Sequence, residues 1–236
     1  MTHPRLRAER GPHGFTRLLL ACQERHNPLD AALARALRDA FAEDPGELVV
    51  LGSTGRDVFC AGADLTIGEA ERAEVSGLLY QCLEIMITRP GPVIAAVGGP
   101  AVAGGAQLAT AADLRIAGPA ARFRWIAPPG RDLAAGAWVL PDLVGRGRAA
   151  ELAMTGRWVD AAEALALGLV NRLEPEPLPA AEELAADLAA GGAGSLARIK
   201  MITATGGLLD RLHAERRANQ EAWAQALASD PGDPHR

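Results

Sequence analysis

Short runs of apolar residues recur along the chain and alternate with longer stretches rich in alanine and leucine. Four of these runs have the length and composition of β-strands, and they cover residues 15–20, 48–51, 92–97 and 113–117. Continuously apolar strands that are separated by helices are typical of parallel sheets covered on both faces. The pattern therefore predicts an α/β fold.

Two of the predicted helices have recognisable ends. The first begins at Asn27, which stands at the N-cap position, with Pro28 and Asp30 in the first turn. Its apolar positions repeat at the helical period and share one face: Leu29, Leu33, Leu37 and Phe41. Further along, a capping pattern begins at Asp160, and Gly168 marks the end of that helix.

The composition changes towards the C-terminus, where residues 174–179 form a proline-rich linker. Three helical patterns follow this linker: 180–190, 195–205 and 208–227. We therefore predict an α/β core over residues 1–178 and a C-terminal helical region over residues 179–236. A terminal helix is stable only when its apolar face is buried, so the last helix packs on the core or on a neighbouring subunit.

Composition and charge exclude several classes of protein. Of the 236 residues, 49% are hydrophobic and 22% are charged, which is ordinary for a globular chain. The net charge of −5 indicates no basic surface for nucleic acid. No apolar run approaches the roughly 18 residues that cross a membrane. The N-terminal residues lack the features of a secretory signal, so we expect a cytoplasmic protein.

The usual metal ligands and nucleophiles are scattered along the sequence. The cysteines are few and widely spaced, which predicts neither a disulfide framework nor a zinc site, and no cluster of acidic or histidine residues has metal-binding spacing. The histidines lie near the termini or at a helix start, so a serine or cysteine nucleophile has no base. Cys60 is interpreted as a small buried apolar residue. The glycine-rich turns do not match a dinucleotide-binding motif.

Two glycine-rich segments directly follow apolar strands. Residues 54–65 come after the strand at 48–51, and residues 99–108 come after the strand at 92–97. Small residues in the second segment open a helix whose first amides have no partner within the helix and carry the positive end of its dipole. Such amides hold a developing negative charge. Each turn taken alone is also explained by a geometric need for glycine.

Taken together, the two segments resemble the enoyl-CoA hydratase/isomerase (crotonase) superfamily. The resemblance rests on CAGADL at 60–65 followed by PVIAAVGGPAVAGGAQLATAADLRIAGPAARF at 92–123. It begins at QERHNPLDAALARALRDAF (23–41) and continues through LPDLVGRGRAAELAMTGRWVDAAEALALGLVNRL (140–173). In all, it covers residues 15–173 in order.

The resemblance implies a crotonase-like (ClpP/crotonase) fold, in which repeated ββα units form two stacked sheets with helices outside. It also implies a C-terminal helical region that assembles the chain into homotrimers, alone or paired into hexamers. The implied ligand is an acyl-CoA thioester, so coenzyme A is part of the substrate and no separate cofactor or metal is expected.

In the resembling proteins two backbone amides polarise the thioester carbonyl, and the matching positions here are Ala63 and Gly104. Preorganised donors of this kind typically contribute about 100- to 1000-fold each to the rate. The resemblance places coenzyme A along the first turn, over Ala61, Ala63, Asp64, Leu65 and Thr66. Arg25 is either a partner for a CoA phosphate or a surface arginine, and Trp125 either lines an acyl pocket or packs in the core.

The resemblance breaks at the groups that move protons. Family hydratases use two glutamates around one water, and the matching positions here are Gln107 and Ala127. Glutamine does not accept a proton at neutral pH, and each missing acid or base typically removes about 100- to 10,000-fold of rate. Asp132, the only carboxylate in the remodelled segment 129–138, either takes over proton transfer or is a solvated loop residue.

Two functions from different classes follow. One is an enzyme of the enoyl-CoA hydratase or isomerase type, a lyase or isomerase of fatty acid metabolism with weak or altered activity. The other is a non-catalytic acyl-CoA binding or carrier protein, which keeps the oxyanion-binding amides without the glutamates. Under either function, Gln107 is a polar residue at the pocket floor that orients the thioester or a water.

Overall fold

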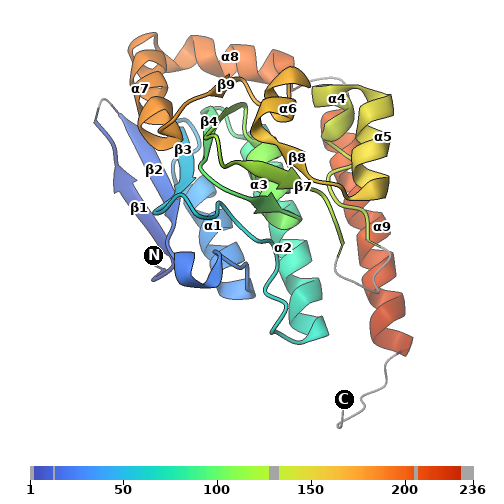
Figure 1. Ribbon diagram of the computed structural model, residues 1–236. Helices are drawn as coiled ribbons and strands as arrows, with labels where there is room; N and C mark the ends of the chain where they lie inside the picture. Colours follow the sequence, from blue (N-terminus) through green and yellow to red (C-terminus); the bar gives the residue numbers. More distant parts are fainter. Residues whose placement is uncertain (1–2, 13, 128–132, 205–206, 230–236) are drawn as a thin grey trace.

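The computed structural model describes residues 3–12, 14–127, 133–204 and 207–229, which form two sheets surrounded by helices (Figure 1). The larger sheet has the order β1-β2-β3-β4-β6-β9 and is parallel apart from the β1–β2 hairpin. Its strands are β1 (Leu6–Arg10), β2 (Phe15–Leu20), β3 (Leu48–Ser53), β4 (Val93–Val97), β6 (Leu114–Ala117) and β9 (Arg172–Leu173). The smaller sheet contains β5 (Ala101–Val102), β7 (Arg122–Arg124) and β8 (Val159–Asp160).

The four strands predicted from apolar runs are confirmed as β2, β3, β4 and β6. The strands that the sequence pattern missed are polar or very short. β1 has the sequence LRAER and buries only its first residue, whereas β5, β8 and β9 contain two residues each. A two-residue strand cannot display an alternating pattern, so only its tertiary partners define it.

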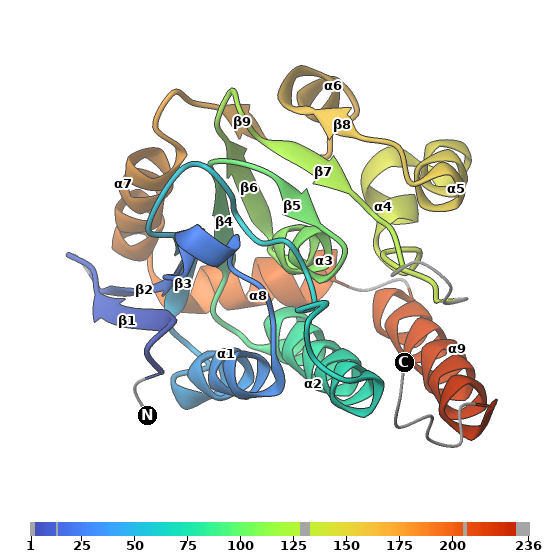
Figure 2. The same cartoon turned by 60° about the horizontal axis from the view of Figure 1, so that its bottom comes forward.

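Helices cover both faces of the larger sheet (Figures 1 and 2). Val49 and Leu51 of β3 face a core shared with α1, α2 and α3, whereas Leu48 and Val50 face α7. Since successive side chains of a strand point to opposite faces, a strand covered on both sides is apolar throughout. The predicted α/β architecture is confirmed. These helices are α1 (Ala31–Glu43), α2 (Glu69–Thr88), α3 (Gly104–Ala111) and α7 (Pro177–Ala190).

The start of α1 differs from the prediction. Its N-cap is Asp30, whose side chain accepts a hydrogen bond from the Leu33 amide at 2.9 Å. Asn27 instead has a left-handed backbone (φ 49°) and a buried side chain. Its Oδ1 accepts from the Cys22 amide at 2.7 Å, and its Nδ2 donates to the Phe59 carbonyl at 2.9 Å. Asn27 therefore ties the chain before α1 to the first glycine-rich turn rather than capping the helix.

The second capping pattern is confirmed. Asp160 is the N-cap of α6 (Ala161–Ala166), and its side chain accepts from the Glu163 amide at 2.8 Å. Gly168 follows this helix in a left-handed conformation (φ 78°), which glycine adopts without steric cost. Two further helices precede α6 in the chain: α4 (Leu140–Val144) and α5 (Arg146–Thr155). A 3-10 turn, η1 (Gln23–Arg25), precedes α1.

Three helices follow β9, as predicted: α7, α8 (Ala193–Thr203) and α9 (Leu208–Ser229). α7 begins at Pro177, inside the segment predicted as a linker, because proline is favoured in the first turn of a helix. Ala181 and Ala185 of α7 pack against the larger sheet. The predicted division at residue 178 thus falls within α7, and the existence of two domains stays a prediction.

Polar contacts hold α8 and α9 on the core. The Lys200 ammonium of α8 is buried and donates to the Asp113 carboxylate at 2.8 Å and to the Met86 carbonyl at 2.7 Å. α9 lies beside α2 (Figure 2), and the Tyr80 hydroxyl of α2 donates to the Glu215 carboxyl of α9 at 2.7 Å. Among the helices that the structure describes, none is long and apolar enough to cross a membrane.

Gly105, the second residue of α3, provides a test of how tightly the two glycine-rich turns pack. A Cβ at this position would overlap the Cys60 carbonyl oxygen, which is backbone and cannot swing away. We expect Gly105→Ala to lower the free energy of unfolding by about 1–3 kcal/mol, the usual cost of overpacking. Urea denaturation measures this loss.

Gly147, in α5, is the matched control because no atom lies within 4 Å of a Cβ placed there. We expect Gly147→Ala to raise the free energy of unfolding by about 0.4–1 kcal/mol, since alanine restricts the unfolded chain. Equal effects of the two substitutions would contradict the close contact at Gly105.

Candidate functional site

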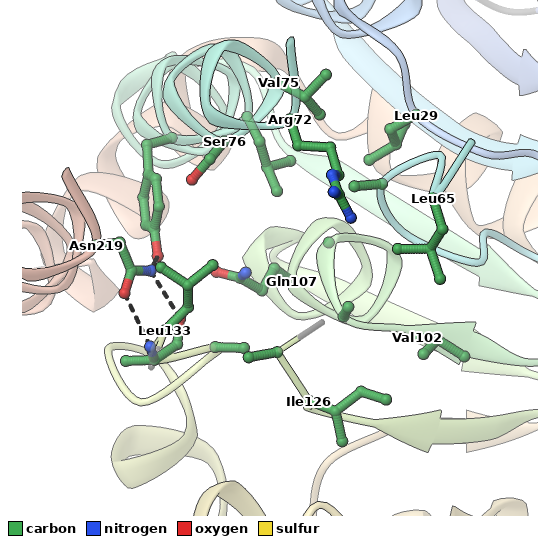
Figure 3. Close-up of a pocket in the computed structure, with 18 of the residues that line it drawn as sticks. Leu29, Leu65, Arg72, Val75, Ser76, Val102, Gln107, Ile126, Leu133 and Asn219 are labelled. Carbon is green, nitrogen blue, oxygen red and sulfur yellow. Dashed lines mark hydrogen bonds between the residues drawn. The ribbon is translucent and has the colours of Figure 1, made fainter. Parts of the chain in front are cut away.

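A pocket with about 890 Å³ of empty space, counting the part open to solvent, lies between α2, α3, α9 and residues 126–127 and 133–135 (Figure 3). Most of its described lining is apolar. Polar groups enter at a few points only: Arg72, Ser76, Tyr80, Gln107 and Asn219. An apolar pocket with a few convergent polar groups is the usual form of a small-molecule site.

The two glycine-rich turns meet at this pocket. The Phe59 and Cys60 amides donate to the Pro100 carbonyl at 3.0 and 3.2 Å, and the Val102 amide donates to the Cys60 carbonyl at 2.9 Å. Gly62 has a left-handed backbone (φ 85°), and a Cβ there would lie 2.9 Å from the Val102 oxygen. Glycine is therefore required at Gly62 for both its backbone conformation and its close approach to the second turn.

Ala63 and Gly104, the predicted oxyanion-binding residues, both line the pocket. The neighbouring amides are engaged, since the Asp64 amide donates to Leu29 and the Ala103 amide donates to Arg124, each at 2.8 Å. Among the described residues, no protein acceptor faces the amides of Ala63 and Gly104. Gly104 is also the first residue of α3, where the helix dipole is positive. The structure thus brings two available donors into one pocket, and their role stays a prediction.

Gln107 and Ala127 lie in the same pocket. The Trp138 indole donates to Gln107 Oε1 at 3.0 Å, so the Gln107 carbonyl oxygen is engaged and its amide nitrogen is left as a donor. No carboxylate is present among the described residues of the pocket lining. Asp132, the proposed substitute for a glutamate, lies outside the described residues.

The predicted CoA-binding turn has an internal polar network. Asp64 is buried, and its carboxylate accepts from the Thr66 amide at 2.9 Å, from the Thr66 hydroxyl at 2.6 Å and from Arg25 Nη2 at 2.6 Å. Burial by itself raises the pKa of Asp64, but the bonds from Thr66 and Arg25 outweigh it and lower the pKa. Arg25 is therefore fixed beside the turn, while Leu65 is 61% exposed and Ala61 lines the pocket.

Two residues singled out from the sequence are buried in the core. Trp125 is fully buried, stacks on Phe123 with ring centroids 6.2 Å apart, and is not among the described residues of this pocket lining. The core alternative for Trp125 fits this position. Cys60 is also fully buried, and burial raises the pKa of its thiol to about 12. A thiol with this pKa is not a nucleophile at neutral pH.

A buried polar cluster on α9, which the sequence analysis missed, supports the pocket. Glu215 accepts from the Tyr80 hydroxyl at 2.7 Å, from the Gly136 amide at 3.1 Å and from the Trp138 amide at 3.0 Å. Asn219 donates to the Tyr80 oxygen at 2.8 Å and also accepts from the Ala134 amide at 2.8 Å. These bonds hold residues 134–138 against α2 and α9 and so position the Trp138 indole, which donates to Gln107.

The sequence carries a weak signal for this cluster. Leu212, Glu215, Asn219 and Trp223 recur at spacings of three and four, so they share one face of α9. A glutamate and an asparagine in the middle of an otherwise apolar face indicate polar partners across the interface, since buried polar groups need hydrogen bonds. The partners themselves could not be read from the sequence.

The fold and this pocket define a crotonase-type protein, and comparison with known proteins agrees. The chain matches the family model described as enoyl-CoA hydratase/isomerase over residues 13–230, and it belongs to this family. The crystal structure of an enoyl-CoA hydratase from Mycobacterium avium subsp. paratuberculosis is similar, with a TM-score of 0.83 and 26% identity over 96% of this chain and 95% of that one. The predicted family and crotonase-like fold are confirmed.

Two curated bacterial proteins are also similar to the chain. A Thermus thermophilus protein provisionally named an enoyl-CoA hydratase is 40% identical over 187 residues, which are 73% of this chain and 74% of that protein. A Bacillus subtilis protein provisionally named an enoyl-CoA hydratase/isomerase is 42% identical over 155 residues. That match spans 61% of this chain and 58% of the length of the Bacillus protein.

The titration of Glu215 gives a prediction for stability. Burial raises the pKa of Glu215 in the folded protein, although the hydrogen bonds from Tyr80 and the loop amides oppose this shift. The folded state therefore binds the proton of the Glu215 carboxyl more tightly than the unfolded chain does. The stability that comes from this tighter binding is complete below the ordinary pKa of 4.5 and is lost as the pH rises. We expect wild type to lose stability relative to Glu215→Gln as the pH rises above the ordinary pKa of 4.5.

Urea denaturation of both proteins across this pH range measures the difference. Glu221→Gln is the control, because Glu221 is an exposed residue of the same helix. A constant difference between wild type and Glu215→Gln at every pH would show that the two states bind the Glu215 proton equally.

Proposed function

We propose that the chain binds acyl-CoA thioesters in this pocket, with the thioester carbonyl oxygen on the amides of Ala63 and Gly104. The observation that supports this proposal is the convergence of these two unengaged amides at the wall of an apolar pocket large enough for an acyl group. Coenzyme A would then extend along the turn of residues 61–66, with Arg25 beside it as a partner for phosphate.

Hydration of an enoyl-CoA would be weak or altered at this site. The reaction needs a base that takes a proton from water as its oxygen attacks C3, and an acid that gives a proton to C2 of the resulting enolate. Gln107 presents an amide nitrogen, and Ala127 has no polar group. We propose that the oxyanion-binding amides are retained while both acid–base positions are replaced, which leaves Asp132 as the candidate for proton transfer.

The second candidate function is a non-catalytic acyl-CoA binding or carrier protein. The bond from Trp138 to Gln107 favours it, because a protein donor already occupies one of the two lone pairs of the Gln107 side-chain oxygen.

We also propose a cytoplasmic homotrimer or hexamer acting in fatty acid metabolism. Neighbouring exposed apolar side chains on α8, Ile199, Met201 and Ile202, support an interface between copies.

Equilibrium dialysis against crotonyl-CoA, with mass spectrometry of both compartments, distinguishes the two functions. Bound and unchanged thioester would support the carrier, or a reaction on another CoA thioester. Conversion to a hydroxyacyl-CoA or to a shifted alkene would support the enzyme. Failure of any acyl-CoA to bind would contradict the proposed function.

Gly104 tests the placement of the thioester. A Cβ there would lie 2.9 Å from a methyl group of Leu79 and 3.2 Å from one of Leu29, so a larger side chain would fill the pocket beside the amide. We expect Gly104→Val to weaken crotonyl-CoA binding by about 10-fold or more, measured by calorimetry. Gly77→Val is the control, because Gly77 of α2 has open space around it. Unchanged affinity in a folded Gly104→Val protein would contradict this placement.

Restoring both carboxylates tests the cause of the altered activity. Glu at position 107 can still accept the Trp138 bond through one oxygen, so its second oxygen would be available to a water. We expect Gln107→Glu combined with Ala127→Glu to raise the rate of crotonyl-CoA hydration by about 100-fold or more. The two single variants are the controls. No gain in a folded double variant would mean that the remodelled loop, rather than the missing acids, limits hydration.

A further inference from the structure

Arg72 is the one cationic side chain among the described residues of the pocket lining. It lies near the start of α2, and Val75, Ser76 and Leu79 follow it along the pocket wall at helical spacing. Figure 3 shows its guanidinium projecting from α2 into the pocket, on the side of Leu65. The function proposed above gives this charge no task, since the thioester carbonyl is held by backbone amides.

The guanidinium lacks the hydrogen-bond partners that arginines usually have. The Arg72 side chain is only 19% exposed, and its Nε is buried without an acceptor. The Glu69 carboxylate lies 3.6 Å from Arg72 Nη2, which is within reach of an ion pair but too long for a hydrogen bond. Leaving a partly desolvated cation with unmade hydrogen bonds is unfavourable, so an acceptor supplied by a ligand would be bound strongly.

Other arginines of the chain show what full pairing looks like. Arg115 is buried, and its guanidinium donates to the backbone carbonyls of Leu169 and Ala112. Arg157 donates to the Glu151 carboxylate at 2.8 Å and to both oxygens of Glu163 at 2.9 and 2.6 Å. Arg72 has no comparable set of acceptors among the described residues. The pocket that it faces is mostly apolar and supplies few acceptors.

We propose that Arg72 makes the site selective for CoA thioesters whose acyl group ends in a carboxylate, an inference that rests on the proposed acyl-CoA binding. A carboxylate matches the planar fork of a guanidinium and accepts two parallel hydrogen bonds from it. In this proposal the acyl chain starts at the Ala63 and Gly104 amides. Arg72 belongs to the same pocket wall as Leu79, a methyl group of which would lie 2.9 Å from a Cβ at Gly104. The ligand class is therefore the monothioester of a short dicarboxylic acid.

Pairs of ligands with the same number of non-hydrogen atoms test this assignment. Glutaryl-CoA ends in a carboxylate, and 5-methylhexanoyl-CoA ends in an uncharged branch of similar size. Succinyl-CoA with 4-methylpentanoyl-CoA, and adipyl-CoA with 6-methylheptanoyl-CoA, vary the chain length. Calorimetry on the full-length protein should show that wild type prefers the charged member of at least one pair by about 10- to 100-fold.

Arg72→Met should abolish this preference without weakening the binding of the uncharged member, and Arg72→Lys should retain part of it. Arg35→Met is the control for net charge, because Arg35 of α1 pairs with Glu74 of α2 and does not line the pocket. Circular dichroism confirms that each variant is folded.

Three outcomes separate the possible failures. If wild type binds no acyl-CoA, the proposed function itself is wrong. If wild type binds both members of every pair equally, the acyl-CoA site stands and the carboxylate selectivity is overturned. If Arg72→Met weakens all thioesters and free coenzyme A by the same factor, Arg72 binds a CoA phosphate and the assignment is again overturned.

Discussion

The first glycine-rich turn and the start of α3 approach one another so closely that side chains are excluded between them. Backbone bonds from Phe59, Cys60 and Val102 join the two segments, and the contact at Gly105 leaves no room for a Cβ beside the Cys60 carbonyl. Each turn ends a strand of the same parallel sheet, β3 or β4, so the sheet fixes their separation. The meeting of the Ala63 and Gly104 amides in one pocket is a consequence of this packing.

The opposite side of the pocket depends on α9. Glu215 and Asn219 hold residues 134–138, and Trp138 in turn holds Gln107 of α3. A chain of hydrogen bonds therefore links the C-terminal helix to Gln107 in the pocket. Because the Glu215 carboxyl is buried and accepts several bonds, removing it would leave several donors unpaired at once. The C-terminal region thus helps to build the site as well as the fold.

The sequence predicted the parts of the structure that local pattern determines. Strands such as β3 and β4 are buried on both faces, so their apolar runs are unambiguous. The N-cap of α1 was misplaced because Asn27 and Asp30 are both good capping residues, and only the tertiary bonds of Asn27 to Cys22 and Phe59 decide between them. Gln107 and the two turns were placed by resemblance to a family. Arg72, Tyr80 and Glu215 were missed, since their importance depends on contacts between α2, α9 and the pocket that are remote in sequence.

Most of the polar groups that enter the pocket are hydrogen-bond donors. They are suited to binding a negatively charged group of a ligand, and none of these donors can accept a proton. The amides of Ala63 and Gly104, the Gln107 amide nitrogen and the Arg72 guanidinium are all donors. Two of the side-chain oxygens nearby, Gln107 Oε1 and Asn219 Oδ1, already accept bonds from Trp138 and Ala134. Under the proposed function, these donors would stabilise the enolate formed from a bound thioester, because preorganised donors act most strongly where water is excluded. The described lining of the pocket holds no carboxylate, so a group that removes a proton from water would have to come from outside that lining.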